Sequence, residues 1–107
     1  MGAMVELTDA NFESEVIQAD GPVLVDFWGP SCGPCRMLMP VLEQLAGDNA
    51  GKIKIGKVNV NENFGIAAQY QVQLLPTLLF FKGGDVVKSF TGAQPANVLQ
   101  KAIDELA

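Results

Sequence analysis

The sequence of 107 residues has no histidine, two cysteines and only seven basic residues. Structural zinc sites take four Cys or His ligands, and catalytic zinc sites take at least three protein ligands. Two cysteines without histidine do not meet either requirement. A zinc site shared between two molecules stays open, but nothing in the sequence supports it. The net charge of -5, with no basic cluster, argues against binding to nucleic acid or to an anionic membrane. We therefore expect the partners to be proteins.

The sequence also lacks long apolar runs. No segment approaches the ~20 apolar residues of a membrane span, and Met1–Glu6 has neither the basic flank nor the apolar stretch of a signal peptide. We therefore expect a cytoplasmic protein without a membrane segment. Met1–Ala3 precede a second methionine, Met4, and are interpreted as a remnant of cloning without functional meaning.

The length and composition are typical of one compact domain, here residues 1–107, because 49% of the residues are hydrophobic and 18% are charged. We expect it to be a monomer. The predicted elements are a strand at 5–7, a helix at 8–18 capped by Thr8 or Asp9, a strand at 23–27, a helix from Cys32 or Gly33 to Gly47, a strand at 53–60, a short helix capped by Asn61 or Asn63 and reaching Tyr70, strands at 77–81 and 86–90, and a helix over 98–106.

The order of these elements predicts the fold class. Strands that alternate with helices in the first two thirds of the chain favour parallel pairing, whereas the last two strands form an antiparallel hairpin around Lys82-Gly83-Gly84-Asp85. The expected fold is therefore α/β, a mixed sheet with helices on both faces.

The two cysteines form the motif Cys32-Gly33-Pro34-Cys35 after an apolar strand. At the start of a helix, thiols three positions apart lie on one face and are able to form a disulfide. A loop this short stabilises a fold by only about 2 kcal/mol, against about 4.7 kcal/mol for a loop of a hundred residues, so a structural staple would be poorly placed here. The spacing favours reversible dithiol chemistry over a pair of inert core thiols.

The two sulfurs are expected to have different roles. At a helix N-terminus the unpaired N–H groups and the macrodipole stabilise a thiolate, which makes Cys32 the candidate nucleophile. Cys35, about one turn further along, is expected to be more buried and to act as the resolving thiol.

Asp26 interrupts the apolar strand, where an unpaired carboxylate would cost several kcal/mol. We expect burial to raise its pKa, which makes it a candidate proton acceptor from Cys35 through water, with Lys57 as an electrostatic neighbour. The alternative is a carboxylate satisfied by backbone hydrogen bonds. Trp28 is predicted to cap the core and to form an apolar floor beside the thiols, with its indole N–H free to donate.

These residues resemble the thioredoxin family in order and spacing over nearly the whole chain. The matching positions are Asp26-Phe27-Trp28, Cys32-Gly33-Pro34-Cys35-Arg36, Pro40, Lys57, Pro76-Thr77, Phe81, Gly84 and Gly92. The resemblance implies the thioredoxin fold, a five-stranded mixed sheet flanked by four helices, and reduction of disulfides in oxidised client proteins. It implies no bound metal or organic cofactor, and electrons supplied by a thioredoxin reductase linked to NADPH or ferredoxin.

The resemblance also implies site residues. Cys32 attacks, Cys35 resolves, Asp26 accepts a proton beside Lys57, and Pro76 follows a cis peptide bond. The implied substrate groove contains Trp28, Ser31, Gly33, Pro34, Leu75, Pro76, Gly92 and Ala93. Three positions depart from the family pattern: Ser31 replaces a usual Trp, Leu74 a small residue and Asn61 a frequent aspartate. Ser31 is expected to shift the preference for substrate or reductase.

Two other functions stay open at this point. A related oxidase or isomerase would form or reshuffle disulfides in an exported compartment, but Gly33-Pro34 and the missing export signal favour the reductant. A binding module on the same fold would hold a partner through this surface without turnover.

Overall fold

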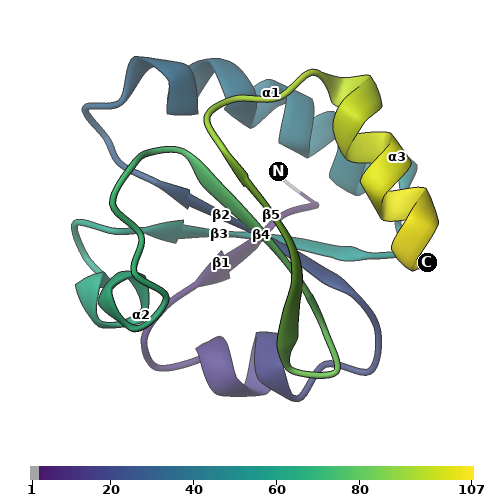
Figure 1. The fold of residues 1–107 in the computed structure, drawn as a ribbon, viewed down its shortest axis with the longest axis horizontal. Coiled ribbons are helices and arrows are strands. Elements are labelled where there is room, and N and C mark those ends of the chain that lie inside the picture. Colours follow the sequence, from purple (N-terminus) through teal and green to yellow (C-terminus); the bar gives the residue numbers. More distant parts are fainter. Residues whose placement is uncertain (1–2) are drawn as a thin grey trace.

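The computed structural model describes residues 3–107, and its centre is one mixed sheet of five strands in the order β1-β3-β2-β4-β5 (Figure 1). The strands are β1 (Val5–Leu7), β2 (Val23–Trp28), β3 (Lys54–Asn59), β4 (Thr77–Lys82) and β5 (Asp85–Thr91). β3 pairs in parallel with both β1 and β2, whereas β4 is antiparallel to β2 and β5. The predicted parallel portion and closing hairpin are therefore confirmed.

Helices cover both faces of this sheet. They are η1 (Glu13–Ile17), α1 (Gly33–Asp48), α2 (Phe64–Gln69) and α3 (Ala96–Leu106). Figure 1 shows α1 and α3 on one face, and α2 with the purple-blue η1 on the other. This arrangement confirms the predicted fold class. Within residues 3–107, no helix combines the length and the apolar character that a bilayer crossing requires.

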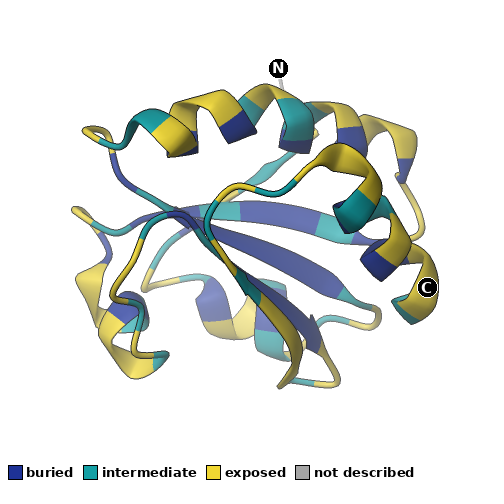
Figure 2. Cartoon of the chain, turned by 45° about the horizontal axis from the view of Figure 1, so that its top comes forward, coloured by how far each residue is buried: buried dark blue, intermediate teal, exposed yellow. Residues whose placement is uncertain are grey.

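Each face of the sheet carries its own hydrophobic core. One core joins Leu24, Ile55 and Phe80 of the strands to Leu42 of α1 and Ile103 of α3. The other joins strand residues to η1 and α2, and includes Phe12, Val16, Phe27, Ala67 and Phe81. Because the central strands are covered on both sides, they are buried along nearly their whole length (Figure 2).

The alternation of side chains along β2 places Asp26 beneath α1. Leu24 belongs to the core under α1 and α3, whereas Val25 and Phe27 belong to the opposite core. Successive side chains of a strand point to opposite faces, so Asp26 shares the face of Leu24. The anomalous carboxyl group therefore lies on the face covered by the helix that carries Cys35.

The first helix differs from the prediction of a helix over 8–18. The regular element is the short π-helix η1, in which the amide of Gln18 donates to the carbonyl of Glu13, five residues earlier, at 3.0 Å. Thr8 still caps this segment, because its Oγ1 accepts from the Asn11 amide at 3.2 Å while Asn11 Oδ1 accepts from the Thr8 amide at 2.7 Å. This reciprocal pair is the geometry of a capping box.

Two of the other three predicted caps, Asp9 and Asn63, are exchanged between distant segments. Asn63 is the N-cap residue of α2, but its Oδ1 accepts from the amide of Asp9 at 3.0 Å instead of capping its own helix. The helix is capped by Asp9, whose Oδ1 accepts from the amide of Ile66 at 3.0 Å. The two side chains thus tie the start of α2 to the loop after β1, a pairing that local sequence patterns do not reveal.

Candidate active site

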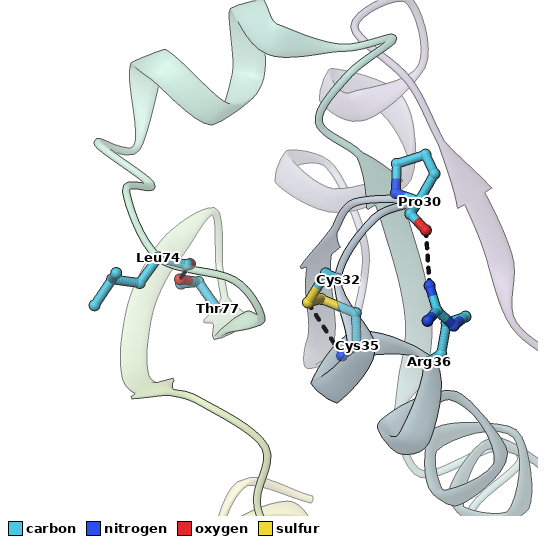
Figure 3. Close-up of a disulfide and its surroundings, with 6 residues drawn as sticks. All are labelled: Pro30, Cys32, Cys35, Arg36, Leu74 and Thr77. Atoms are coloured by element: carbon cyan, nitrogen blue, oxygen red, sulfur yellow. Dashed lines mark hydrogen bonds between the residues drawn. A yellow bond between two sulfur atoms is a disulfide. The ribbon is translucent and has the colours of Figure 1, made fainter.

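The two cysteines are joined by a disulfide at the N-terminus of α1 (Figure 3), with their Cα atoms 5.3 Å apart. Cys32 is the N-cap residue and has extended backbone angles, so α1 begins at Gly33 with Pro34 in its first turn, where a missing N–H costs little. Cys32 Sγ accepts a hydrogen bond from the amide of Cys35 at 3.1 Å. The sulfur therefore occupies the capping position that an oxygen of Ser or Asp usually takes.

The two sulfurs differ in their access to solvent. Cys35 is fully buried, whereas Cys32 is partly exposed at the positive end of a helix of 16 residues. This arrangement is not that of two inert core thiols, because the outer sulfur is accessible and already bonded to the inner one. It provides one reactive sulfur and one protected sulfur.

Asp26 is fully buried in the centre of the sheet. Neither of its carboxylate oxygens receives a hydrogen bond from any residue in 3–107, which contradicts the alternative of a carboxylate satisfied by the backbone. Burial raises the pKa of Asp26 from 3.8 to about 7, and the nearby charge of Lys57 lowers it by a smaller amount. The expected rise in pKa is confirmed, and desolvation is its main cause.

Lys57 lies beside this carboxyl group, and Trp28 lies two residues further along β2. Lys57 is the direct neighbour of Asp26 in the parallel pairing of β3 with β2. Trp28 ends β2 and is half-buried, and its indole N–H finds no acceptor within residues 3–107. A hollow of about 470 Å³ opens at the surface here, lined by Trp28, Arg36, Met39, Pro40, Glu43 and Lys57.

The segment before β4 forms one side of the site. The Leu75–Pro76 peptide bond is cis, as the family resemblance implies, and Pro76 is buried. The Pro76 carbonyl accepts from the amide of Gly92 at 2.8 Å, which joins this segment to the end of β5. Leu75 turns inward, since a Cβ added to Gly29 would lie 3.0 Å from Leu75 Cδ1.

The other predicted groove residues lie on the side of α1. Gly33, Pro34 and Ala93 line a hollow of about 530 Å³ together with Arg36 and Met37. Ser31 is exposed immediately before the disulfide. The structure therefore brings together residues from three separate segments around the N-terminus of α1: 29–35, which includes its first turn, 71–76, and 91–95 at the end of β5.

Two residues near the site have roles that the sequence did not indicate: Arg36, which appeared only as part of the matching motif, and Met37. Arg36 Nη1 donates to the Pro30 carbonyl at 2.9 Å, so it holds the loop before Cys32 (Figure 3). Met37 is 78% exposed although it is apolar. The sequence contained a signal for this exposure. In a helix that starts at Gly33, Met37 falls outside the stripe of Cys35, Leu38, Leu42 and Leu45 that faces the core.

Comparison with known proteins agrees with this geometry. A protein-family model described as Thioredoxin matches residues 3–105. The chain belongs to the thioredoxin family. Similar family members include Thioredoxin from Chlorobaculum thiosulfatiphilum, 53% identical over 97% of this chain and 96% of that protein. Others are Thioredoxin 1 from Nostoc sp. and Thioredoxin from Haemophilus influenzae, each 47% identical over 98% of both chains.

Membership of the thioredoxin family defines the chemical class of the site. With its paired cysteines at disulfide distance, the protein is a thiol–disulfide oxidoreductase. Thioredoxins carry out this chemistry without a bound cofactor. Across residues 3–107 there is no cluster of three or more Cys, Asp or Glu side chains placed to hold a metal ion.

Proposed function

We propose that this thioredoxin-family protein reduces disulfides in client proteins and is itself re-reduced by a thioredoxin reductase. The observation that carries the proposal is the asymmetry of the dithiol. Cys32 is accessible and its sulfur receives a backbone N–H at a helix N-terminus, whereas Cys35 is sealed from solvent. The first environment favours an attacking thiolate, and the second keeps the other thiol in reserve.

In the first step, the Cys32 thiolate attacks one sulfur of the client disulfide. A bond forms between Cys32 Sγ and that sulfur, the client S–S bond breaks, and the second client sulfur leaves as a thiolate that takes a proton. The amide of Cys35, which bonds to Cys32 Sγ in the disulfide form, stabilises negative charge on that sulfur in the reduced form.

In the second step, Cys35 loses its proton and attacks Cys32 Sγ. The bond between Cys32 and the client breaks, the client leaves as a second thiolate, and the Cys32–Cys35 disulfide forms. We assign Asp26 as the acceptor of the Cys35 proton, because its carboxyl lies on the face covered by α1 and has a pKa of about 7. Lys57, which is paired with Asp26 and also lines the hollow beside Trp28, favours the ionised carboxylate.

The client is proposed to bind around Cys32 as an extended segment. Residues from the three segments, together with Trp28 at the end of β2, provide the contact surface, and the backbone of Leu75 pairs with the client. The proposed contact residues are Trp28, Ser31, Gly33, Pro34, Leu75, Pro76, Gly92 and Ala93.

A coupled assay tests the activity and the electron source together. Insulin reduction is measured with NADPH and an NADPH-linked reductase, and separately with a ferredoxin-linked reductase. Turnover with either reductase supports the proposal, and the absence of turnover with both contradicts it. We further propose a cytoplasmic, monomeric protein of one domain over residues 1–107, which cell fractionation and sedimentation check.

Trapping experiments test the roles of the two sulfurs. Cys35→Ser is expected to stop after the first step and accumulate a mixed disulfide with the client, whereas Cys32→Ser should form none and have no activity. Trapping through Cys35 in the Cys32→Ser variant would reverse the assignment.

Two further measurements separate this function from the alternatives. Redox titration against glutathione distinguishes a reductant from an oxidase or isomerase, since a markedly oxidising potential would favour the latter. Replacing both cysteines by Ser distinguishes turnover from binding, because a pure binding module would keep its biological activity.

A further inference from the structure

Leu74 is a large apolar side chain exposed beside the disulfide. Its side chain is 65% exposed, although the next residue, Leu75, packs inward against Gly29. The Leu74 carbonyl accepts a hydrogen bond from Thr77 Oγ1, which anchors the backbone of this segment at the start of β4. Figure 3 shows Leu74 on the segment that faces the disulfide, with its side chain directed away from the sulfur atoms.

The segments around the disulfide have almost no charge with which to select a client. Residues 29–35, 71–76 and 91–95 contain no Asp, Glu, Lys or Arg, although the chain has 12 acidic residues. Charged side chains lie at the border of these segments, where Arg36 lines the hollow with Pro34 and Ala93, and Lys57 and Glu43 line the hollow with Trp28. The segments themselves therefore discriminate among clients by shape and apolar contact.

Apolar area is distributed unevenly around Cys32. Ser31, immediately before the cysteine, offers only a small hydroxyl-bearing side chain. Large exposed apolar side chains lie instead at Leu74 and at Met37, where Met37 lines the hollow with Pro34 and Ala93. Leu74 lies on the segment that faces the disulfide, so a client held by a bond to Cys32 Sγ is brought close to that segment.

We propose that Leu74 is a specificity-determining residue. It selects clients that carry an apolar side chain a few residues from the disulfide cysteine, in the part of the client chain that lies over segment 71–76. This inference rests on the proposed function, since it needs a client tethered to Cys32. The Leu74 side chain points away from the sulfurs, so the contacted residue is not the immediate neighbour of the client cysteine but one further along an extended client.

A positional scan with uncharged peptides tests the proposal. Each probe is a symmetric disulfide-linked peptide pair rich in Ser and Gly, with one Leu placed one to four residues before or after the cysteine. The kcat/KM for reduction is measured for each probe and divided by its rate of reduction with dithiothreitol. The protein is expected to prefer the best-placed Leu over Ser by about fivefold, on one side of the cysteine only.

Variants then assign this preference to one side chain. Leu74→Gly is expected to reduce the preference, the ratio of normalised kcat/KM for the best-placed Leu peptide to that for the Ser peptide, to about one. Leu74→Met is expected to retain most of this preference, since Met keeps the apolar volume. The matched control is Val86→Ser. Val86 is also an exposed apolar residue, at 42%, but it pairs with Phe81 at the end of the sheet opposite the disulfide, so its removal should leave the profile unchanged.

The possible results separate the two proposals. An unchanged profile in Leu74→Gly, or an equal loss of rate for all peptides, would overturn the selective role of Leu74 while leaving the reductase function intact. A protein that reduced none of the probes, and did not reduce insulin, would overturn the proposed function itself.

Discussion

Asp26 is the residue at which the requirements of folding and of chemistry conflict most directly. A carboxylate in the centre of a sheet loses its hydration, and no residue in 3–107 provides a hydrogen bond in return. A hydrophobic residue would stabilise the fold better. The carboxyl group is nevertheless well suited to proton transfer, because its pKa of about 7 lies near neutral pH.

Asp26→Asn is predicted to stabilise the folded protein at neutral and higher pH. The pKa of Asp26 is raised from 3.8 to about 7 by burial, so between these values the folded protein holds a proton that the unfolded chain releases. Stability of the unmodified protein therefore falls as pH rises from about 4 to 7 and then levels off. Above pH 8 the variant should be more stable by about 4 kcal/mol, and below pH 4 the difference should disappear.

Denaturant unfolding of the oxidised protein at several pH values measures this difference. Asp104→Asn provides the control, because hydrogen bonds from Gln100 and Lys52 lower the pKa of this exposed carboxyl. Its effect should be small and of opposite sign. A gain for Asp26→Asn that did not depend on pH would contradict an origin in the buried charge.

Ser31→Trp is predicted to change the interaction with partners more than the potential of the dithiol. The substitution adds apolar area at an exposed position next to Cys32, but it leaves the helix N-terminus and the bond from the Cys35 amide in place. Client kinetics and a glutathione titration measure the two effects. Unchanged kinetics with a shifted potential would contradict this expectation.

At the level of elements, the end of α2 has the hydrogen bonds of a Schellman motif without its usual glycine. The amide of Val72 donates to the Ala67 carbonyl at 2.9 Å, and the amide of Gln71 donates to the Ala68 carbonyl at 3.0 Å. Gln71 consequently has a φ of 57°, a left-handed conformation that costs roughly 1–2 kcal/mol for a residue with a side chain.

Gln71→Gly is therefore predicted to stabilise the protein by about 0.5–1 kcal/mol, because part of the gain is offset by the greater freedom of glycine in the unfolded chain. The reciprocal control is Gly51→Ala. Gly51 has a φ of 88° and open space around the position of a Cβ, so alanine there should destabilise through backbone strain alone. Thermal unfolding of both variants checks this, and a loss of stability in Gln71→Gly would contradict it.

Gly56→Ala is predicted to destabilise the sheet by about 1–3 kcal/mol. β1 approaches β3 closely at Gly56, where a Cβ would lie 2.5 Å from Leu7 Cδ1 and 3.1 Å from the Val5 carbonyl oxygen. The backbone oxygen cannot yield as a flexible side chain would, so β1 would be displaced from β3.

Gly47→Ala is the matched control for this substitution. Gly47 lies in α1, is exposed and has nothing within 4 Å of an added Cβ. Alanine should stabilise the helix by about 0.5–1 kcal/mol. Denaturant midpoints of the two variants should thus move in opposite directions, and a neutral Gly56→Ala would show that β1 shifts at little cost.

At the scale of the whole molecule, the net charge of -5 is carried by residues outside the segments that surround the disulfide. Charge should therefore affect the long-range approach of a client more than its final contacts. Reduction of a cationic disulfide peptide is predicted to slow by about two- to fivefold between low salt and 0.5 M salt, and reduction of an anionic peptide to accelerate. Stopped-flow rates with an uncharged peptide as reference measure this, and parallel salt dependences for all three would contradict it.

Much of the fold could be predicted because its signals are local. The apolar run of β2, the amphipathic pattern of α1 and α3, and the glycine-rich turn before β5 each depend on neighbours a few residues apart. Two local features were not predicted correctly. The regular helix spans only Glu13–Ile17 instead of 8–18. The start of α2 is capped by Asp9, while Asn63 binds the amide of Asp9, and this exchange joins segments that meet only after folding.

Residue type and local spacing define the chemistry available to this protein: two sulfurs at the start of a helix and a carboxylate within an apolar strand. The environment of those groups depends on the fold. The pairing of β2 with β3 places Lys57 beside Asp26, no residue in 3–107 gives that carboxyl a hydrogen bond, and Leu74 is exposed on the segment that faces the disulfide. Residue type and spacing can be predicted because they are properties of the chain, whereas burial and charge proximity arise from contacts between distant segments.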